Sequence, residues 1–446
     1  MRVAETLPDA LAAGDIFPDT ARVANNRLAI GGVEVEKLAA EFGTPLYVFD
    51  ETAVLNRARG YRNALKQSYP GKSTVCYASK AYSAPWVLRL LAGEGLGLDV
   101  VSGGELHTGV AADFPRDVIY FHGNSKSEEE LEQALDAGIG RIVMDNLDEI
   151  ELLAKVAERK QKRQAVLIRV GPGVDPHATH AHIATGQVDS KFGLDIANGQ
   201  AEEGTRAALA KKSLDLRGFH FHIGSQLHEI EPYHQSTDVV LDFAAQMRDR
   251  HGLDLRELSP GGGFGVRYTT TDPTVTATTM IADLGAYVAA AARKRGFALP
   301  ELTIEPGRSM IANTAVALYR VGSIKVIPGV RTYVAVDGGM ADNIRPTAYG
   351  SRYSAVLANR VGDQPLVEVA IAGKYCESGD VLIREARIAM PRLGDLVAIP
   401  TAGAYHLAMA SNYNMALRPA VVAVRDGTAR LVRRRETYAD LLAAEL

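Results

Sequence analysis

The chain has 446 residues, of which 47% are hydrophobic and 23% are charged, an ordinary composition for a globular protein long enough to form two domains. The formal net charge is −4 and no apolar run approaches the roughly 20 residues of a membrane helix, which argues against nucleic acid or a membrane as a partner. The two cysteines make no disulfide framework or zinc site, and the N-terminus lacks the apolar core of a signal peptide, so we expect a cytoplasmic protein.

Short apolar segments alternate with helix-patterned segments from residue 46 to 309. The helical segments, such as 127–138, have apolar residues at helical spacing and acids in the first turn. Alternation of this kind predicts a parallel sheet, and eight strands predict an α/β fold with a (β/α)8, TIM-type barrel over 46–309, with 45–50 leading into its first strand. The predicted barrel strands are 74–79, 96–101, 118–122, 141–145, 165–170, 217–222, 254–259 and 302–305.

The predicted strands end in polar or glycine-rich clusters. Examples are Lys80, SGGE (102–105), HGNSK (122–126), GGGFG (261–265) and EPGR (305–308). A barrel enzyme builds its site at the carboxyl ends of all its strands, whereas a doubly wound sheet gathers such clusters near its switch point. The spread of the clusters over nearly every strand therefore favours the barrel.

The pattern changes after residue 310. Short β-type segments separated by Gly, Asp and Pro turns follow one another with little helical periodicity. They predict a second, mostly β domain of sandwich or barrel type formed by 310–446. The segment 26–43 has the pattern of a strand and a helix, so we expect residues 1–45 to pack with this domain.

Lys80 stands at the tip of the first predicted barrel strand. A desolvated lysine amine loses its proton and becomes a nucleophile that can form a Schiff base. A lysine at the rim of the barrel in an ordinary ion pair is the alternative, and the residue alone does not decide between them.

The glycine-rich and acidic strand ends are also ambiguous when each is taken alone. Consecutive glycines let backbone N–H groups converge on an anion, and barrels commonly bind phosphate after strands seven and eight. Glycine clusters are nevertheless most often tight turns, and GGGFG does not match the dinucleotide fingerprint. EPGR supplies a carboxylate and a guanidinium, which can equally form a surface ion pair.

Two histidines of FHFHIGSQ, His220 and His222, lie on one face of a predicted strand. A metal site would need a third ligand, and none with suitable spacing is evident, so we predict no metal. An imidazole over an aromatic cofactor is the better functional interpretation of one histidine, and a core position is the alternative for the other.

Three segments of the predicted β domain carry candidate binding groups. CESGD has a thiol and two acids, and DNIRPTAY presents Arg345 and Tyr349, groups suited to a carboxylate. GAYHLAMASNYN contributes Tyr405. Each could also be a loop ion pair or a core aromatic residue.

Taken together, ten segments in order resemble those of the fold-type III, pyridoxal-phosphate-dependent decarboxylases, and within them the diaminopimelate decarboxylases. The resemblance covers residues 26 to 440, and the family combines a (β/α)8 barrel with a β domain. The segments are YASKAY, DVVSGGEL, HGNSKS, TGQVDSKFG, FHFHIGSQ, GGGFGVRY, EPGRS, RPTAY, CESGD and GAYHLAMASNYN.

The resemblance implies pyridoxal 5'-phosphate (PLP) as cofactor. Lys80 would hold it as a Schiff base, His222 would stack on its ring, and Glu305 would keep the pyridine nitrogen protonated, which improves the ring as an electron sink. The other residues implied to bind the cofactor are Asp99, Ser225, Gly261, Gly262, Gly263, Gly307, Arg308 and Tyr405.

The resemblance also implies the substrate, meso-2,6-diaminopimelate, which carries an amino acid at each end. A pocket for it must neutralise a second zwitterion, and two arginines, a tyrosine and a glutamate match that demand. A substrate whose tail is only an amine would favour acids there instead. The residues implied to bind the substrate are Arg308, Arg345, Tyr349, Glu377 and Tyr405.

Cys376 would return a proton to the reacting carbon, because a thiol with an ordinary pKa near 8.5 can give up a proton around neutral pH. In the family, the residues at Cys376 and Glu377 reach the active site of the partner subunit. The resemblance therefore implies a homodimer with shared active sites.

The implied activity is that of a carboxy-lyase, which decarboxylates diaminopimelate at its D centre to L-lysine and CO2, the last step of lysine biosynthesis. The alternative is a sister decarboxylase acting on ornithine, arginine or carboxynorspermidine. A racemase would not be expected to carry CESGD, and a non-catalytic PLP carrier would lack the β domain. The chain departs from the usual family motifs at Tyr82, which we interpret as a packing difference, and in the segment with His406, Leu407, Met415 and Ala416, where the departures bear on substrate preference or loop mobility.

Overall fold

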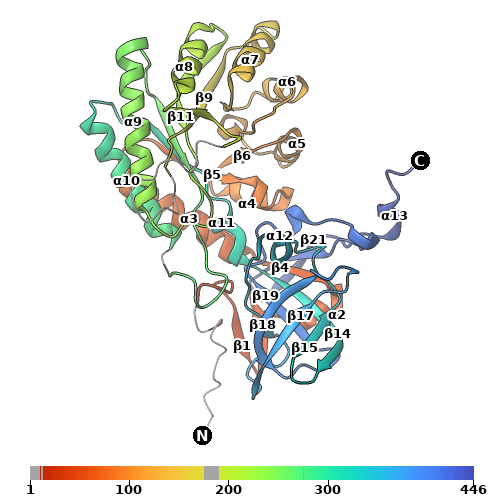
Figure 1. The fold of residues 1–446 in the computed structure, drawn as a ribbon. Helices are drawn as coiled ribbons and strands as arrows, with labels where there is room; N and C mark the ends of the chain where they lie inside the picture. The colour runs from red at the N-terminus through yellow and green to blue at the C-terminus, as the bar shows by residue number, and fades with distance from the viewer. Residues whose placement is uncertain (1–10, 12–13, 175–189, 275) are drawn as a thin grey trace. The chain divides into compact units, whose positions relative to one another are not determined.

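The computed structural model describes residues 11, 14–174, 190–274 and 276–446, which form two compact units. The barrel unit comprises Ala58–Gly265 and Val275–Ser309, and the β unit comprises Met1–Arg57, Val266–Thr274 and Met310–Leu446. Figure 1 shows the strands and helices of each. No helix in the described part of the chain combines the length and the apolar character that crossing a membrane requires.

The barrel unit contains the predicted closed ring of eight parallel strands. Each strand pairs with the next, and β13 pairs with β5 to close the ring. The eight strands are β5 (Ser73–Ala78), β6 (Gly97–Val100), β7 (Ile119–Phe121), β8 (Arg141–Met144), β9 (Gln164–Gly171), β11 (Leu214–His220), β12 (Glu257–Gly261) and β13 (Glu301–Ile304).

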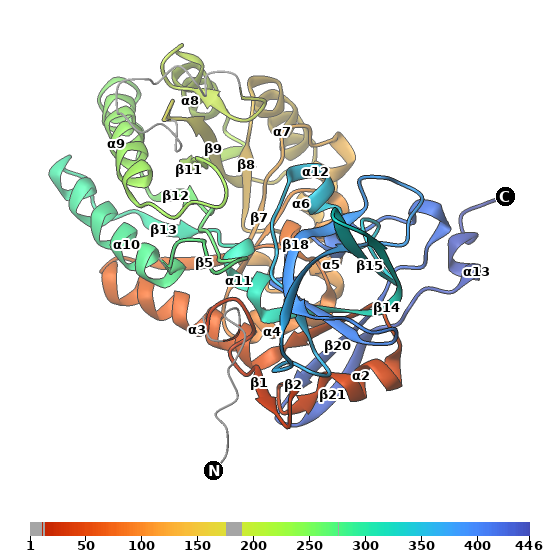
Figure 2. The same cartoon turned by 60° about the horizontal axis from the view of Figure 1, so that its bottom comes forward.

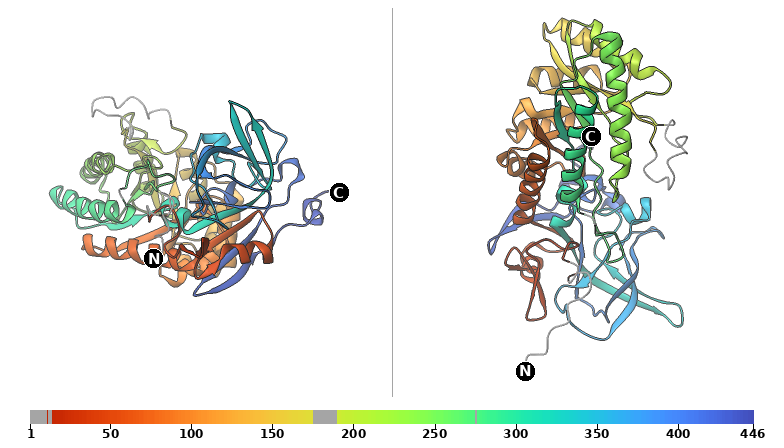
Figure 3. Two further views of the ribbon diagram at one scale, coloured as in Figure 1. Left: turned by 90° about the horizontal axis from the view of Figure 1, so that it is seen from below. Right: turned by 90° about the vertical axis from the view of Figure 1, so that its left-hand side faces the viewer.

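Helices follow the barrel strands, as the alternating pattern predicts. Ser127 and Glu130 form a capping box at the start of α6, and Gly138 ends this helix in the left-handed conformation. The two long helices α9 and α10 lie side by side (Figures 1 and 3). The helices of this region are α3 (Glu51–Ser68), α4 (Pro85–Gly93), α5 (Gly103–Ala111), α6 (Glu128–Ala137), α7 (Leu147–Arg159), α8 (Gln200–Ala210), α9 (Glu231–His251) and α10 (Ala277–Lys294).

The interior of the barrel is packed with side chains from several of its strands. Cys76, Tyr120, Val143 and Leu167 form one buried cluster, and the hydroxyl of Tyr120 lies 3.4 Å from that of Thr303. The strand register also decides which side chains share an edge, because Ala78 pairs with Asp99 and His220 pairs with Ser259.

The β unit is built on a second sheet, drawn from another side in Figure 2. Its main path runs β18-β17-β15-β14-β4-β20-β21, and β19 pairs with both β14 and β16. Its strands are β4 (Leu46–Asp50), β14 (Ala315–Ile327), β15 (Arg331–Val336), β16 (Val356–Leu357), β17 (Leu366–Ala372), β18 (Val381–Ala389), β19 (Leu396–Pro400), β20 (Ala420–Arg425) and β21 (Thr428–Arg433).

The N-terminal segment packs into the core of the β unit. It forms β1 (Arg22–Ala24), β2 (Arg27–Ile30), β3 (Val33–Glu34) and α2 (Val35–Phe42). Buried Leu28 and Leu38 belong to the same apolar cluster as Val316 and Val422 of the main sheet. The hydrophobic effect therefore holds this segment on the β unit.

The unit boundary differs from the expected one at residue 46. The segment 45–50, predicted to lead into the barrel, forms β4 in the sheet of the β unit, where it pairs with β14 and β20. The division of the chain into compact units falls after Arg57, and Val266–Thr274 also belongs to the β unit.

Candidate active site

Lys80 and two further residues implied to bind the cofactor lie at the carboxyl ends of the barrel strands. Lys80 directly follows β5, in the short 3-10 helix Ser79–Ala81, and is exposed. Asp99 of β6 is buried; burial raises the pKa of its carboxyl, against the opposing effects of His122 and Lys80. Burial and the nearby Lys80 ammonium lower the pKa of His222 well below 6.5, so its ring is neutral.

Glu305 follows β13 and is held on both carboxylate oxygens. Ser259 of β12 donates to Oε1 at 2.8 Å, and Nε2 of His220 lies 3.0 Å from Oε2. A second imidazole, that of His122 after β7, places its Nε2 3.4 Å from Oε1. Three different strand ends thus fix the carboxylate in one orientation.

The electrostatics of this cluster favour an ionised carboxylate. Burial alone would raise the pKa of Glu305, but His220 and His122 outweigh it and hold this pKa well below its usual value. Burial lowers the pKa of His220 to about 4, so this ring is neutral and donates from Nε2. Burial also opposes the charged form of His122, but Asp99 and Glu305 outweigh it and raise the pKa of His122.

A loop of glycines continues from β12 and approaches neighbouring backbone too closely for any side chain. A Cβ atom on Gly262 would lie 2.0 Å from the carbonyl oxygen of Glu305. On Gly263, whose φ is +102°, it would lie 2.3 Å from the carbonyl oxygen of Gly224. Only glycine fits these positions, and the loop presents bare backbone of the kind that binds phosphate.

Arg308 and Ser225 lie together, because Nη2 of Arg308 donates to the Ser225 hydroxyl at 3.0 Å. Gly307 packs against β5, where a Cβ atom would lie 3.1 Å from that of Ala78. An amine, an ionised buried carboxylate, a neutral imidazole, a serine and a glycine loop are the groups that the aldehyde, pyridinium, ring face and phosphate of PLP require. The residues of the barrel unit therefore fit this cofactor.

Arg345 begins the short helix α12 (Arg345–Tyr349) of the β unit and is buried. Its Nε donates to the hydroxyl of Tyr353 at 3.2 Å, and its Nη2 donates to that of Ser351 at 3.2 Å. Its guanidinium carbon lies 5.4 Å from the ring centre of Tyr349 and 5.5 Å from that of Tyr405. The structure thus brings together three of the residues implied to bind the substrate.

Cys376 and Glu377 are exposed on a loop between β17 and β18. The backbone N–H of Cys376 donates to Oδ1 of Asn414 at 2.9 Å, and the Tyr413 hydroxyl donates to its carbonyl oxygen at 3.4 Å. Glu377 accepts from the backbone N–H of Gly379 at 3.2 Å. The loop therefore has a defined conformation that presents both side chains to solvent.

The predicted site residues divide between the two units. Those implied to bind the cofactor lie in the barrel unit except Tyr405, whereas those implied to bind the substrate lie in the β unit except Arg308. Of the polar motif TGQVDSKFG, only 190–193 is among the described residues.

Sequence reasoning gave no role to several residues that contact this site. Ser259 and His122 bind Glu305, and Tyr353 binds Arg345. None of these three residues was assigned a function from the sequence. His122 directly follows β7, so its place at the edge of the barrel was the one available signal.

His122, His220 and Glu305 place one potential metal ligand each within 4.8 Å of one another. The sequence around the two histidines of FHFHIGSQ did not suggest such a set of three ligands. The carboxylate of Glu305 is, however, already bonded to Ser259 and His220.

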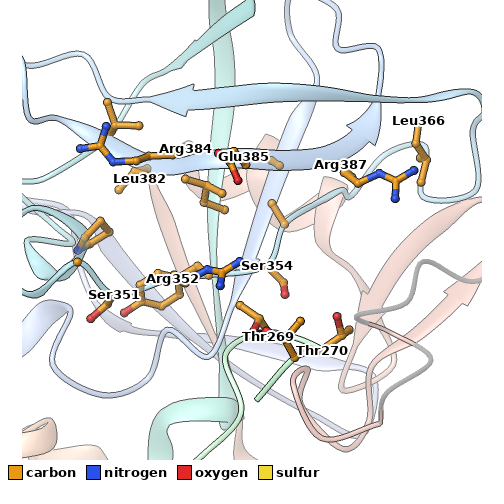
Figure 4. A pocket seen from close by; sticks show the side chains of 18 of the residues that line it. Thr269, Thr270, Ser351, Arg352, Ser354, Leu366, Leu382, Arg384, Glu385 and Arg387 are labelled. Carbon is orange, nitrogen blue, oxygen red and sulfur yellow. Dashed lines mark hydrogen bonds between the residues drawn. The ribbon is translucent and has the colours of Figure 1, made fainter. Parts of the chain in front are cut away.

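An open cavity of about 800 Å³ lies on the β unit (Figure 4), and its lining includes Ser351 and Tyr353, the hydrogen-bond partners of Arg345. It is lined by Thr269–Thr271, by 350–355 and by 381–387, with Arg352, Arg384, Glu385 and Arg387 on its walls. None of the predicted site residues belongs to its lining.

Comparison with known proteins agrees with this chemistry. The family described as "Pyridoxal-dependent decarboxylase, pyridoxal binding domain" matches residues 53–312. The diaminopimelate decarboxylase of Bacillus subtilis (strain 168) is 46% identical over 95% of this chain and 96% of its own, and that of Actinosynnema pretiosum subsp. auranticum is 42% identical over all of both chains.

A solved structure shows the same architecture. The crystal structure of diaminopimelate decarboxylase from M. jannaschii in co-complex with L-lysine superposes with a TM-score of 0.91 at 35% identity, covering 96% of this chain and 98% of the other. The similarity therefore extends over both units and not only over the matched cofactor domain. The chain belongs to the pyridoxal-dependent decarboxylase family and, within it, to the diaminopimelate decarboxylases.

Proposed function

We propose that the protein uses PLP to decarboxylate meso-2,6-diaminopimelate at its D centre, which yields L-lysine and CO2. The observation that carries the cofactor part is the buried, ionised Glu305 held by Ser259 and His220. An ionised carboxylate is the group that keeps a pyridine nitrogen protonated. The substrate part rests on Arg345 and on the long, high-identity match to diaminopimelate decarboxylases.

Each barrel residue has one task in this proposal. Bound PLP supplies an electron sink for the electron pair that remains when CO2 leaves. Lys80 anchors the cofactor, and its exposure leaves room for the incoming substrate amine. His222, neutral and fixed by the backbone N–H of Gly262 at 3.4 Å, lies against the ring face. Ser225 and the backbone of Gly261, Gly262 and Gly263 hold the phosphate. Asp99 lies beside Lys80, and Gly307 leaves room for Arg308 to approach the cofactor.

The β unit recognises the end of the substrate that does not react. The guanidinium of Arg345 binds the distal carboxylate, with Tyr349 as a further donor from the β unit and Arg308 as one from the barrel unit. Glu377 binds the distal amine, and Tyr405 contacts both cofactor and substrate. Tyr349 is 62% exposed in the single chain, which is compatible with a position that a ligand or a second subunit covers.

We further propose a homodimer in which Cys376 and Glu377 complete the partner's site. Cys376 holds the proton that returns to the reacting carbon. Both side chains are exposed in the single chain, which is compatible with a place in the site of a second subunit. Neither cysteine forms a disulfide, which supports a cytoplasmic site of action.

The test is to supply PLP to the purified protein and to offer meso-diaminopimelate, ornithine, arginine and lysine separately, following CO2 and the chirality of the product. We expect CO2 and L-lysine from meso-diaminopimelate alone. CO2 from ornithine or arginine instead would keep the fold and cofactor but overturn the roles of Arg345 and Glu377, in favour of a sister decarboxylase.

A further inference from the structure

His406 lies within a buried chain of hydrogen bonds in the β unit. Its Nε2 is 2.9 Å from the hydroxyl of Tyr353, which also accepts from Nε of Arg345 at 3.2 Å. Its Nδ1 is 3.2 Å from the hydroxyl of Tyr47. That hydroxyl donates to Asp342, whose carbonyl oxygen and Oδ2 lie at 3.1 and 3.2 Å. The chain thus joins a buried cation to a buried carboxylate through three neutral groups.

The positions of the protons along this chain follow from its two ends. Arg345 can only donate, so the Tyr353 hydroxyl accepts from its Nε and keeps its own proton for an acceptor such as Nε2 of His406. The carbonyl and carboxylate of Asp342 can only accept, so Tyr47 donates to them and must accept from Nδ1. His406 is therefore the neutral tautomer with its hydrogen on Nδ1. Burial, and the charge of Arg345, lower the pKa of His406 well below 6.5 and keep it neutral.

Every donor in the chain points from Arg345 toward Asp342, so the hydrogen bonds polarise one another in the same direction. Nε and Nη2 of Arg345 are used by Tyr353 and Ser351. In the described part of the chain, the hydrogen bonds of this guanidinium go to two hydroxyl groups and not to a carboxylate. The guanidinium is therefore held in place by neutral groups, which do not neutralise its charge.

The neighbouring backbone adds a second reason to regard His406 as part of the site. Tyr405 has a φ of +61°, a left-handed conformation that a tyrosine adopts only where its surroundings enforce it. With both ring nitrogens bonded, the His406 side chain anchors the residue that follows this strained position. The same anchor thus fixes Arg345 and the backbone that carries Tyr405.

We propose that His406 is a positioning residue, which acts through Tyr353 to orient the guanidinium of Arg345 toward the carboxylate at the non-reacting end of the substrate. The inference rests on the proposed function, since it assigns a further residue to the same reaction. It predicts a loss of affinity that is specific for ligands with that carboxylate.

The test compares two inhibitors of the PLP-loaded, full-length enzyme. L-lysine, the expected product, keeps the distal carboxylate, whereas 1,5-diaminopentane has the same carbon chain without it. Tyr353→Phe removes only one hydroxyl, and His406→Leu removes both ring bonds. We expect each variant to weaken inhibition by L-lysine and to raise KM for diaminopimelate about tenfold, the effect of one lost hydrogen bond to a charged group. We expect inhibition by 1,5-diaminopentane, kcat and the Kd for PLP to change less than about twofold.

Tyr319→Phe is the matched control, because it removes a buried hydroxyl that bonds Asp342 and lies 3.4 Å from that of Tyr47, at the end of the chain away from Arg345. It should lower Tm without changing the ratio of the two inhibition constants. Equal weakening of both inhibitors by Tyr353→Phe, or a ratio unchanged from wild type, would overturn the positioning role. Wild-type enzyme that neither decarboxylates diaminopimelate nor binds L-lysine would overturn the proposed function first, and this inference with it.

Discussion

Mixing two inactive variants tests the shared active site more directly than either variant alone. Lys80→Ala removes the cofactor anchor of the barrel unit, and Cys376→Ala removes the proton donor of the β unit. If the two residues of one site come from different subunits, a heterodimer of the variants has one site with both residues intact and one with neither. Random pairing of equal amounts makes half of the dimers heterodimers, so the mixture should recover about 25% of wild-type activity.

The assay needs verified heterodimers. Two affinity tags, one on each variant, allow sequential purification of heterodimers, which should show about half of the wild-type kcat per dimer because one site in two is complete. A mixture of Cys376→Ala with Glu377→Ala is the matched control. Both residues come from the same unit, so every site in such a heterodimer has one defect and activity should not return. Purified Lys80→Ala/Cys376→Ala heterodimers no more active than their parents would refute shared sites.

Three further predictions concern the barrel unit. Lys80→Ala should abolish the lysine-linked chromophore, and borohydride reduction of wild type should fix PLP on the peptide containing Lys80; label on another lysine would contradict the anchor. Ser259→Ala removes the hydroxyl that donates to Glu305 at 2.8 Å. It should raise the Kd for PLP about tenfold, because a lost hydrogen bond to a charged group costs about 1.4 kcal/mol. Thr303→Val, which removes another buried hydroxyl of the same barrel, should leave this Kd unchanged. His220, with its pKa lowered to about 4, contributes stability that is full above its unfolded pKa near 6.5 and is lost as the pH falls toward 4, by at most about 3 kcal/mol. His220→Gln should therefore reduce the fall in Tm between pH 7 and 5, and an unchanged fall would show that other groups control it.

The eight barrel strands were predictable because each has a local signature, an apolar run followed by a helix. The segment 46–50 shows where such signatures stop being informative. LYVFD is buried at every position, as a barrel strand would be, yet β4 pairs with β14 and β20. Its partner strands lie more than 260 residues further along the chain. The sequence of a short apolar segment does not indicate which strands it will pair with.

The candidate site residues were predictable for a related reason. A parallel barrel places every strand end at one edge, so Lys80, Asp99 and Glu305 had to share that edge once the strands were recognised. The partners that tune them were not predictable. The contact of His220 with Glu305 spans 85 residues, and that of His406 with Tyr353 spans 53. Such contacts depend on rotamers and on strand register to within one residue, which composition and periodicity do not specify.

The two polar networks solve one physical problem in the same way. A buried charge that must act on a ligand needs fixed partners, but an opposite charge beside it would compete with the ligand. Glu305 is bonded at 2.8 and 3.0 Å by the Ser259 hydroxyl and the neutral His220, with His122, whose pKa is raised, farther away at 3.4 Å, and Arg345 is bonded by the hydroxyls of Tyr353 and Ser351. Asp342 carries the charge that balances Arg345, and it lies at the other end of the chain of hydrogen bonds that passes through His406. Under the proposed function, this distance leaves the guanidinium charge for the substrate carboxylate, and a direct aspartate partner would be expected to weaken binding rather than strengthen it.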